Sequence, residues 1–248
     1  MNHSIEDICE MLDTLELPAA SARFHELACS PELSNFSAIQ FLREVMEPAY
    51  IEKLNNRFET NLRLSSLINK SALASNLKTG NGRIYNDLIV SQILTFRFVE
   101  ERQNVGVYGT TAAGKSYFLD ACCVEACRKN FRSKYVDYSD LLDELIVLNR
   151  LDNLDRYRKR LKYYARIQLL FIDDFAISRY SEEGIKILYH LIKMRTDLGT
   201  STMFSCQYAP DEWGDQLSDE PGCYGKLDGI RRRLTDGFTV LIEKSSNY

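Results

Sequence analysis

The stretch Gly109-Thr-Thr-Ala-Ala-Gly-Lys-Ser116 decides the fold, because it fits the pattern G-x-x-x-x-G-K-[ST]. Glycines let backbone N–H groups turn inward around phosphate oxygens, and the start of a following helix adds partial positive charge. In such a loop the lysine reaches the β- and γ-phosphates of ATP, and the serine hydroxyl holds Mg²⁺. The residues expected to bind ATP are Gly109, Thr110, Thr111, Ala112, Ala113, Gly114, Lys115, Ser116 and Tyr117, with Ser116 also a metal ligand.

The residues on either side of this loop support that interpretation. Residues 104–108 (Asn-Val-Gly-Val-Tyr) predict a short strand, and residues 115–129 predict a helix. The alternative is an ordinary glycine turn before a helix. A strand directly before the loop and a helix directly after it are the setting in which this pattern binds phosphate, and they favour a P-loop.

Downstream of the loop, strand and helix patterns alternate. Strands are predicted over residues 134–138, 168–173, 200–206 and 238–242. Between them we expect a helix capped by Ser139, a long charged helical stretch reaching about Arg166, and a helix over residues 181–198. This alternation predicts an α/β fold with a mainly parallel sheet covered by helices on both faces.

The first 75 residues predict helices only. Apolar residues recur at helical spacing after Ser4, a candidate N-cap, and Pro18 ends that segment. Ser37 is expected to cap a longer helix that Pro48 either kinks or interrupts. Residues 75–83 are polar and contain glycine, so they are the best linker. We therefore predict a small all-helical domain over residues 1–75 and an ATPase domain over residues 76–248.

Two carboxylates follow the apolar strand Leu169-Leu-Phe-Ile172. Parallel strands leave their carboxyl ends at one edge of the sheet, where the P-loop also lies. Asp173 is expected to orient Mg²⁺ through water, and Asp174 to polarise the attacking water. The alternative is a solvated strand end, since paired aspartates often begin turns.

A third strand, Thr202-Met-Phe-Ser205-Cys206-Gln207, also ends in polar groups. Ser205 or Gln207 could hydrogen-bond the γ-phosphate or the water, although a polar strand end is an equally simple explanation. Near the end of the chain, Arg232 and Arg233 belong to a run of three arginines. Arginine can stabilise a phosphoryl-transfer transition state, often on a neighbouring subunit's ATP, but such a run can also be an ordinary solvated patch.

A basic segment spans residues 150–166, with seven Lys or Arg residues and two acidic ones. Three tyrosines interleave with them, a composition that suits contact with the DNA backbone. The alternative is a solvated helix face with its tyrosines packed inward. The candidate DNA-binding residues are Arg156, Arg158, Lys159, Arg160 and Lys162.

Composition limits the other possibilities. The formal net charge of -4 argues against a general nucleic-acid coat protein but allows local basic patches. No apolar run approaches the ~20 residues of a membrane span, and the N-terminus lacks signal-peptide features. Seven cysteines without C-x-x-C spacing and three histidines argue for reduced thiols and against a zinc site. We therefore expect a cytoplasmic protein with no membrane partner.

Taken together, these motifs resemble the IstB family, the AAA+ ATP-dependent helper proteins of insertion-sequence transposition. The resemblance covers nearly the whole chain, loosely at the N-terminal end and more specifically further on. It rests on Phe36-Ser-Ala-Ile-Gln-Phe-Leu42, Glu101-Arg-Gln-Asn-Val-Gly-Val-Tyr-Gly109, Ser201-Thr-Met-Phe-Ser-Cys-Gln207, Glu212-Trp213-Gly214 and Arg233-Leu234. It implies an AAA+ core, a homo-oligomer on double-stranded DNA, and a transposase of the IstA type as partner.

The chain departs from the family pattern in four respects. The family usually has Glu where Asp174 stands and Asn where Gln207 stands, and its loop often reads Pro-Pro-Gly-Thr where this chain has Thr-Thr-Ala-Ala. The sequence stops at Tyr248, so no helical lid is expected after the last strand. A replicative helicase loader of the DnaC or DnaI type is the alternative function, and a P-loop small-molecule kinase is a third.

Overall fold

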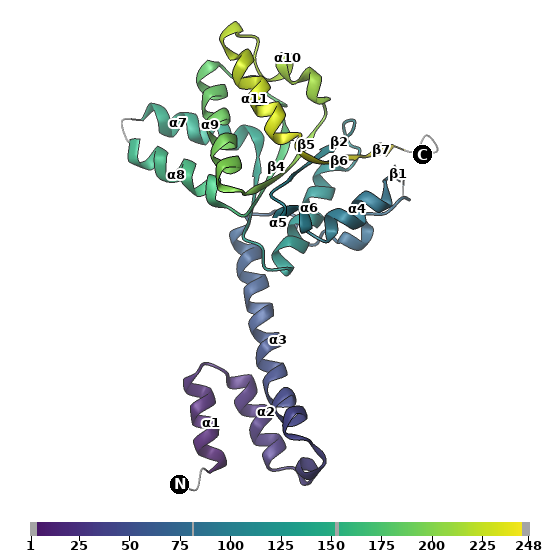
Figure 1. The fold of residues 1–248 in the computed structure, drawn as a ribbon, viewed down its shortest axis with the longest axis vertical. Coiled ribbons are helices and arrows are strands. Elements are labelled where there is room, and N and C mark those ends of the chain that lie inside the picture. Colours follow the sequence, from purple (N-terminus) through teal and green to yellow (C-terminus); the bar gives the residue numbers. More distant parts are fainter. Residues whose placement is uncertain (1–3, 81, 152–153, 245–248) are drawn as a thin grey trace. The chain divides into compact units, whose positions relative to one another are not determined.

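A computed structural model describes residues 4–80, 82–151 and 154–244, and in it the chain divides into two compact units, residues 1–60 and 61–248 (Figure 1). The sequence predicted the division after residue 75. Residues 61–80 group with the second unit because they pack within it. Leu67, Ala72 and Leu77 are buried, and the Tyr135 N–H donates to the Ser65 carbonyl oxygen at 2.7 Å.

The first unit is helical, as predicted. Helix α1 (Ile5–Thr14) starts at a capping box formed by Ser4 and Asp7, and α2 (Pro18–Ala28) begins at a proline. A short 3₁₀ helix (Pro31–Asn35) leads to α3 (Ala38–Leu64), which runs through Pro48 without interruption. The small core of this unit contains Ala20, Leu27, Val45 and Ala49.

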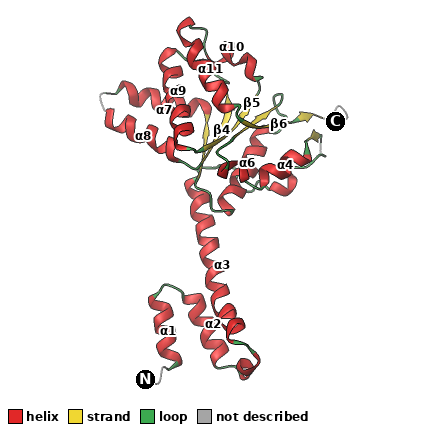
Figure 2. Ribbon diagram, viewed as in Figure 1, coloured by secondary structure: helices red, strands yellow, loops and turns green. Residues whose placement is uncertain are grey.

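The second unit is built on a parallel sheet, drawn in yellow in Figure 2. The sheet has five strands in the order β3-β4-β5-β2-β6. Its strands are β2 (Asn104–Tyr108), β3 (Ser133–Asp137), β4 (Leu169–Phe175), β5 (Ser201–Cys206) and β6 (Gly237–Leu241). Every neighbouring pair is parallel. The predicted α/β fold is confirmed.

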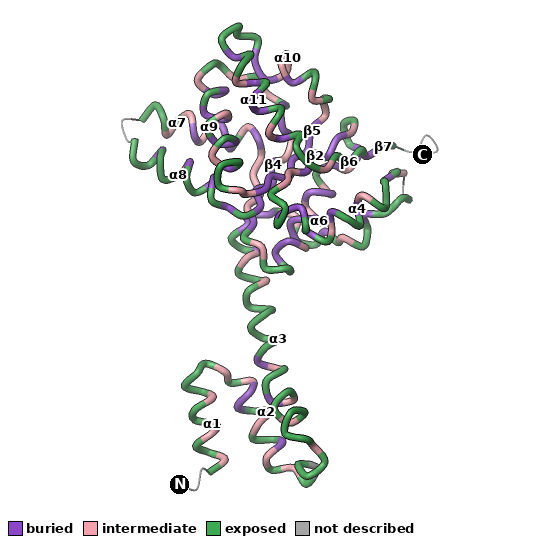
Figure 3. Tube along the Cα trace, viewed as in Figure 1, coloured by how far each residue is buried: buried purple, intermediate pink, exposed green. Residues whose placement is uncertain are grey.

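Helices cover both faces of this sheet. One face packs on α6 (Lys115–Arg128), and the other on α7 (Tyr138–Arg150), α9 (Glu182–Leu198) and α11 (Tyr224–Leu234). The second face holds an apolar cluster that includes Phe175, Phe204 and Trp213. Figure 3 shows the buried residues concentrated on the strands and on these helices. Other helices are α4 (Asp87–Leu94), α5 (Arg97–Glu100), α8 (Leu154–Arg166) and α10 (Trp213–Leu217), and 3₁₀ turns span Ala74–Asn76, Pro210–Glu212 and Pro221–Cys223.

The predicted helix after residue 138 and the charged helical stretch to Arg166 are confirmed as α7 and α8, which separate where Leu151 leaves the helical conformation. Two local predictions were wrong. The cap of α7 is Asp137, whose Oδ1 accepts the Ser139 N–H at 2.7 Å, so Ser139 lies inside the helix instead of capping it. The predicted linker and the end of the chain form a second, small sheet, in which β1 (Arg83–Ile84) pairs antiparallel with β7 (Glu243–Lys244).

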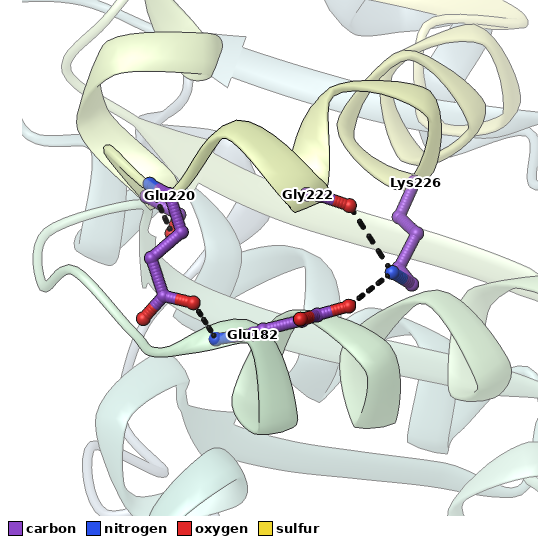
Figure 4. A network of polar contacts seen from close by, with 5 residues as sticks. Glu182, Glu220, Gly222 and Lys226 are labelled. Carbon is purple, nitrogen blue, oxygen red and sulfur yellow. Dashed lines mark hydrogen bonds and ion pairs between the residues drawn. The ribbon is translucent and has the colours of Figure 1, made fainter.

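A polar network fixes the start of α11 against the start of α9 (Figure 4). The Lys226 Nζ donates to Glu182 Oε1 at 2.8 Å and to the Gly222 carbonyl at 3.3 Å. Glu220 accepts the backbone N–H of Glu182 at 3.0 Å. These contacts set the position of the helix that carries the three arginines. Among the described residues, no helix is both long enough and apolar enough to cross a membrane.

Candidate functional site

The P-loop leaves the carboxyl end of β2 and enters α6, as predicted. Gly109 has φ 158°, and a Cβ at this position would lie 2.5 Å from the carbonyl oxygen of Ile242. Backbone atoms cannot move aside cheaply, so only glycine fits this turn. Gly114, with φ 101°, ends the loop in a left-handed conformation that starts the helix at Lys115.

Ala112 is strained within the same loop. Its φ is 61°, a left-handed conformation that disfavours any residue with a Cβ. In the loop pattern Pro-Pro-Gly-Thr of the family that the sequence resembles, glycine stands at this position. The loop therefore has a glycine-type backbone at a residue that carries a Cβ.

Lys115 is almost completely buried, with 5% of its surface exposed. Its Nζ donates to the carbonyl oxygens of Gly109 at 2.9 Å and Thr110 at 3.0 Å. Burial lowers the pKa of Lys115, and the nearby charge of Asp174 opposes that shift. The ammonium group therefore lies inside the loop, where the phosphates of a nucleotide could replace its carbonyl partners.

Asp173 and Asp174 lie near the carboxyl end of β4 at the same edge of the sheet. The Asp173 carboxylate accepts a hydrogen bond from the Tyr135 hydroxyl at 2.8 Å and another from the Ser205 hydroxyl. These two donors hold its oxygens in place. Tyr135 was not predicted as a site residue, because its place inside a strand gives no sign that it faces a carboxylate.

Asp174 has a different environment from Asp173. Its backbone is left-handed, with φ 50°, and its N–H donates to Ser205 Oγ at 2.8 Å. Burial, and then the neighbouring charge of Asp173, raise the pKa of Asp174, while Lys115 opposes the shift. A carboxylate with a raised pKa is better suited to accept a proton than an ordinary surface aspartate.

Ser205 and Gln207 both reach this edge, but they contact different groups. Strand β5 lies between β4 and β2, and its register pairs Cys206 with Tyr108. Ser205 contacts Asp173, whereas Gln207 Oε1 accepts a hydrogen bond from the Thr111 hydroxyl at 2.9 Å. Gln207 is therefore next to the P-loop, where it could respond to a bound nucleotide.

Arg83 is a second residue at this site that was not predicted from the sequence. It lies on β1, and a Cβ added at Gly114 would be 2.6 Å from its Nε. Its guanidinium also lies 6.0 Å from the centre of the Tyr117 ring. A cation thus packs on the P-loop from outside the main sheet. The polar Asn-Gly-Arg context indicated only a linker, so no local pattern could have found it.

The three arginines of α11 have different surroundings. Arg231 pairs with Asp228 at 2.9 Å, and Arg233 donates to the Gly229 carbonyl at 2.8 Å while its guanidinium lies 5.4 Å from the centre of the Tyr189 ring. Arg232 is exposed and has no hydrogen-bond or ion-pair partner in the part of the chain that the structure describes. It is therefore the most available of the three.

These arginines lie at the opposite edge of the sheet from the P-loop. Asn104, the first residue of β2, donates from Nδ2 to the Arg233 carbonyl at 2.7 Å. The P-loop follows the last residue of the same strand, roughly 13 Å away at the usual rise per residue. The arginines thus lie far from the subunit's own phosphate site.

Helix α8 carries part of the predicted basic surface. Tyr157 and Tyr164 point inward and are buried, as the alternative interpretation held. Arg160 forms an ion pair with Glu144 at 2.7 Å, and its guanidinium lies 4.6 Å from the centre of the Tyr164 ring. Arg158, Lys159 and Lys162 are exposed and share one helix face by their spacing. Arg156 is exposed as well.

Comparisons with known proteins agree with this arrangement. The family model described as IstB-like ATP binding protein matches residues 10–234. The ATP-binding protein of insertion sequence IS5376 from Geobacillus stearothermophilus is 22% identical over 225 residues, which cover 91% of this chain and 88% of that protein. The corresponding protein of IS232 from Bacillus thuringiensis is 27% identical over 58% of this chain and 57% of its own length.

Solved structures show the same fold. The crystal structure of DnaI has a TM-score of 0.56 at 19% identity and covers 74% of this chain and 93% of that chain. The replication initiator DnaA bound to AMPPCP and single-stranded DNA has a TM-score of 0.55 at 19% identity over 71% of this chain and 50% of that chain. At these identities the likeness shows the fold and not a shared activity.

Proposed function

The chain belongs to the family of IstB-like ATP-binding proteins, and on that premise we propose that it hydrolyses ATP with Mg²⁺, assembles on double-stranded DNA and assists a transposase of the IstA type at the target site. One observation carries the catalytic part of this proposal. The P-loop, the Asp173–Asp174 pair and Gln207 meet at one edge of the sheet, held by hydrogen bonds from Ser205 and Thr111.

Each residue of this edge has a separate task in the proposed reaction. Lys115 exchanges its two carbonyl partners for the β- and γ-phosphates. The Ser116 hydroxyl and the Asp173 carboxylate are oxygen donors of the kind that Mg²⁺ prefers, and they would hold that ion beside the phosphates. When bound, Mg²⁺ would neutralise the charge that develops on the phosphate oxygens. Asp174 orients the attacking water and accepts its proton.

A neighbouring subunit completes the site. Arg232 lies at the edge of the sheet opposite its own P-loop and has no partner among the described residues, so it can face another subunit's γ-phosphate. An arginine supplied in trans accelerates phosphoryl transfer by ~10³–10⁵-fold. We propose Arg232 for this role, since Arg233 is occupied by Gly229 and Tyr189.

Helix α8 supplies the proposed DNA contact. Its exposed Arg158, Lys159 and Lys162 form a positive face in an otherwise acidic chain. Contacts of this type read the phosphate backbone and not the bases, so binding should be poorly sequence-selective and sensitive to salt. The experiment that tests the whole proposal measures steady-state ATP hydrolysis with and without duplex DNA. Hydrolysis that DNA does not stimulate at any salt concentration would count against it.

A helicase loader is the second candidate, because the fold covers 93% of the DnaI structure. The insertion-sequence relative in turn matches 91% of this chain, which favours the transposition role. The two functions differ in their protein partner. Pull-down of the full chain against a purified IstA-type transposase and a replicative helicase, each with ATP and DNA, distinguishes them.

A further inference from the structure

The segment that directly follows α3, residues 65–69, is attached to two elements of the nucleotide site. Ser65 is completely buried, and its carbonyl oxygen accepts the backbone N–H of Tyr135 at 2.7 Å. Strand β3 lies at the edge of the sheet, so Ser65 bonds the side of β3 that faces away from β4. Four residues later, the Asn69 Nδ2 donates to Asp120 Oδ2 at 3.1 Å. The segment therefore holds one residue of β3 and one of α6.

Asp120 lies beside the expected metal ligand of α6. It follows Ser116 by four residues, so the two side chains share one face of the helix. Its partner Asn69 is held in turn by the Ser71 hydroxyl, which donates to Asn69 Oδ1 at 3.0 Å. Burial raises the pKa of Asp120, whereas hydrogen bonds from Asn69 and from the Tyr135 hydroxyl oppose that shift. Asp120 thus accepts hydrogen bonds from both of these side chains.

The Tyr135 hydroxyl lies between two carboxylates. It donates to Asp173 Oδ2 at 2.8 Å, and Asp120 is close enough to accept from the same group. Burial, and then the charge of Asp173, raise the pKa of Tyr135, so the hydroxyl keeps its hydrogen. A hydroxyl has a single hydrogen and can donate fully to only one acceptor at a time. The two carboxylates therefore compete for it.

The two oxygens of Asp173 have different donors. Oδ1 accepts from the Ser205 hydroxyl and from the Asp174 N–H, the latter at 3.1 Å. Oδ2 accepts from the Tyr135 hydroxyl, its hydrogen-bond donor within the part of the chain that the structure describes. Tyr135 therefore determines how firmly this second oxygen is held.

We propose that Tyr135 is a positioning residue for Asp173, and that Asn69 keeps it in this role by occupying Asp120. With Asn69 bonded to Asp120, the hydroxyl remains with Asp173. Without that bond, the charge of Asp120 draws the hydroxyl away, and Asp173 loses the donor to Oδ2. The end of α3 thereby controls how the carboxylate is presented to Mg²⁺. The inference rests on the proposed role of Asp173 beside Mg²⁺ and adds a control of that site.

Nucleotide binding with and without Mg²⁺ tests this positioning without turnover. The full chain, in the absence of DNA, is titrated with AMPPCP in excess Mg²⁺ and again in EDTA, with a fluorescent ATP analogue as the displaced probe. The ratio of the two affinities is the gain in affinity that Mg²⁺ supplies. General damage to the P-loop would weaken binding in both conditions, so a loss confined to the Mg²⁺ condition identifies a positioning role. Circular dichroism checks the folding of each variant.

The variants should reduce this gain to different extents. Tyr135→Phe removes the hydroxyl but keeps the ring, which stacks on Phe171 with 6.3 Å between ring centres. It should reduce the gain by about tenfold, as expected for a partner of a metal ligand, and leave the affinity in EDTA unchanged. Asn69→Ala should reduce the gain by about threefold, as the loss of one hydrogen bond implies. Adding Asp120→Asn to Asn69→Ala should restore the wild-type gain, because an uncharged amide no longer draws the hydroxyl away.

Asn61→Ala is the matched control. Asn61 is half-buried like Asn69, and its amide also donates one hydrogen bond, to Asn130 Oδ1 at 3.2 Å. This variant should keep the wild-type gain. Three results would each overturn the inference: a wild-type gain in Tyr135→Phe, equal gains in Asn69→Ala and Asn61→Ala, or no restoration by Asp120→Asn.

Asp173→Asn separates this inference from the proposed function. If that variant keeps the full gain, Asp173 does not serve the metal, and the proposed metal site fails together with the inference. If Asp173→Asn loses the gain while Tyr135→Phe keeps it, the metal site stands and only the positioning by Tyr135 is refuted.

Discussion

Replacing Ala112 with glycine should stabilise the protein, although glycine substitutions usually do the opposite. The left-handed backbone at φ 61° costs a residue with a Cβ about 1–2 kcal/mol. Glycine adopts this conformation freely but loses about 0.5–1 kcal/mol through its greater freedom in the unfolded chain. The balance predicts that Ala112→Gly raises the free energy of unfolding by roughly 0.5–1 kcal/mol.

The adjacent residue provides the control. Ala113 is fully buried and is absent from the residues with positive φ. Ala113→Gly removes a buried methyl group, worth about 0.8 kcal/mol, and adds the same entropic loss, so it should destabilise by roughly 1.5 kcal/mol. The two substitutions are chemically identical and lie side by side, so only the local structure predicts opposite signs.

Urea unfolding of the nucleotide-free protein, followed by tryptophan fluorescence, measures both variants. Trp213 lies buried in the core of the ATPase unit and reports on that unit. The urea midpoint should shift in both variants, while the slope of the unfolding free energy against urea concentration should stay equal to that of wild type. A loss of stability in Ala112→Gly similar to that in Ala113→Gly would refute the left-handed conformation assigned to Ala112.

Three further predictions concern catalysis and DNA. Asp174→Asn should leave ATP affinity unchanged in equilibrium binding but lower steady-state turnover by about 10²–10⁴-fold, because an amide cannot accept the proton; turnover within a few-fold of wild type would remove Asp174 from the mechanism. Arg232→Ala should lower kcat by ~10³-fold or more in the assembled protein. Arg231→Ala should have little effect, because Arg231 pairs within its own helix. Equal losses of kcat in the two variants would exclude a specific role for Arg232. Neutralising the exposed side chains of α8 (Arg158→Gln, Lys159→Gln and Lys162→Gln together) should weaken duplex binding for all sequences. It should also reduce the slope of log K against log salt concentration by about 0.9 per lost phosphate contact. Filter binding at several salt concentrations measures both effects, and binding equal to that of wild type would place the DNA surface elsewhere.

Much of the fold could be predicted because its signals are local. The P-loop pattern, the apolar strand before Asp173 and the strand before Gln207 each carry their own sequence signature, and parallel strands bring their ends to one edge. The cap of α7 was misplaced because two neighbouring polar residues, Asp137 and Ser139, were both suitable N-caps. Only the structure shows which side chain accepts the N–H groups.

The parts that were not predicted depend on contacts between distant residues. Tyr135 reaches Asp173 from the neighbouring strand, 38 residues earlier in the chain, and Arg83, on the β1–β7 pair, reaches the P-loop, so neither has a local pattern. The basic run of α8 was visible, but contacts with other elements decide which of its members are available, because Arg160 is held by an ion pair with Glu144. Similarly, three adjacent arginines look equivalent in the sequence, and only their partners single out Arg232.

The most direct test of a site shared between subunits is hydrolysis by a mixture of two inactive variants. Lys115→Ala subunits cannot hold the phosphates but keep Arg232, and Arg232→Ala subunits bind ATP but have lost the donated arginine. Mixed with MgATP and duplex DNA, and shown by sedimentation to co-assemble, they should hydrolyse ATP faster than the sum of the two alone. A co-assembled mixture no more active than that sum would contradict the shared site.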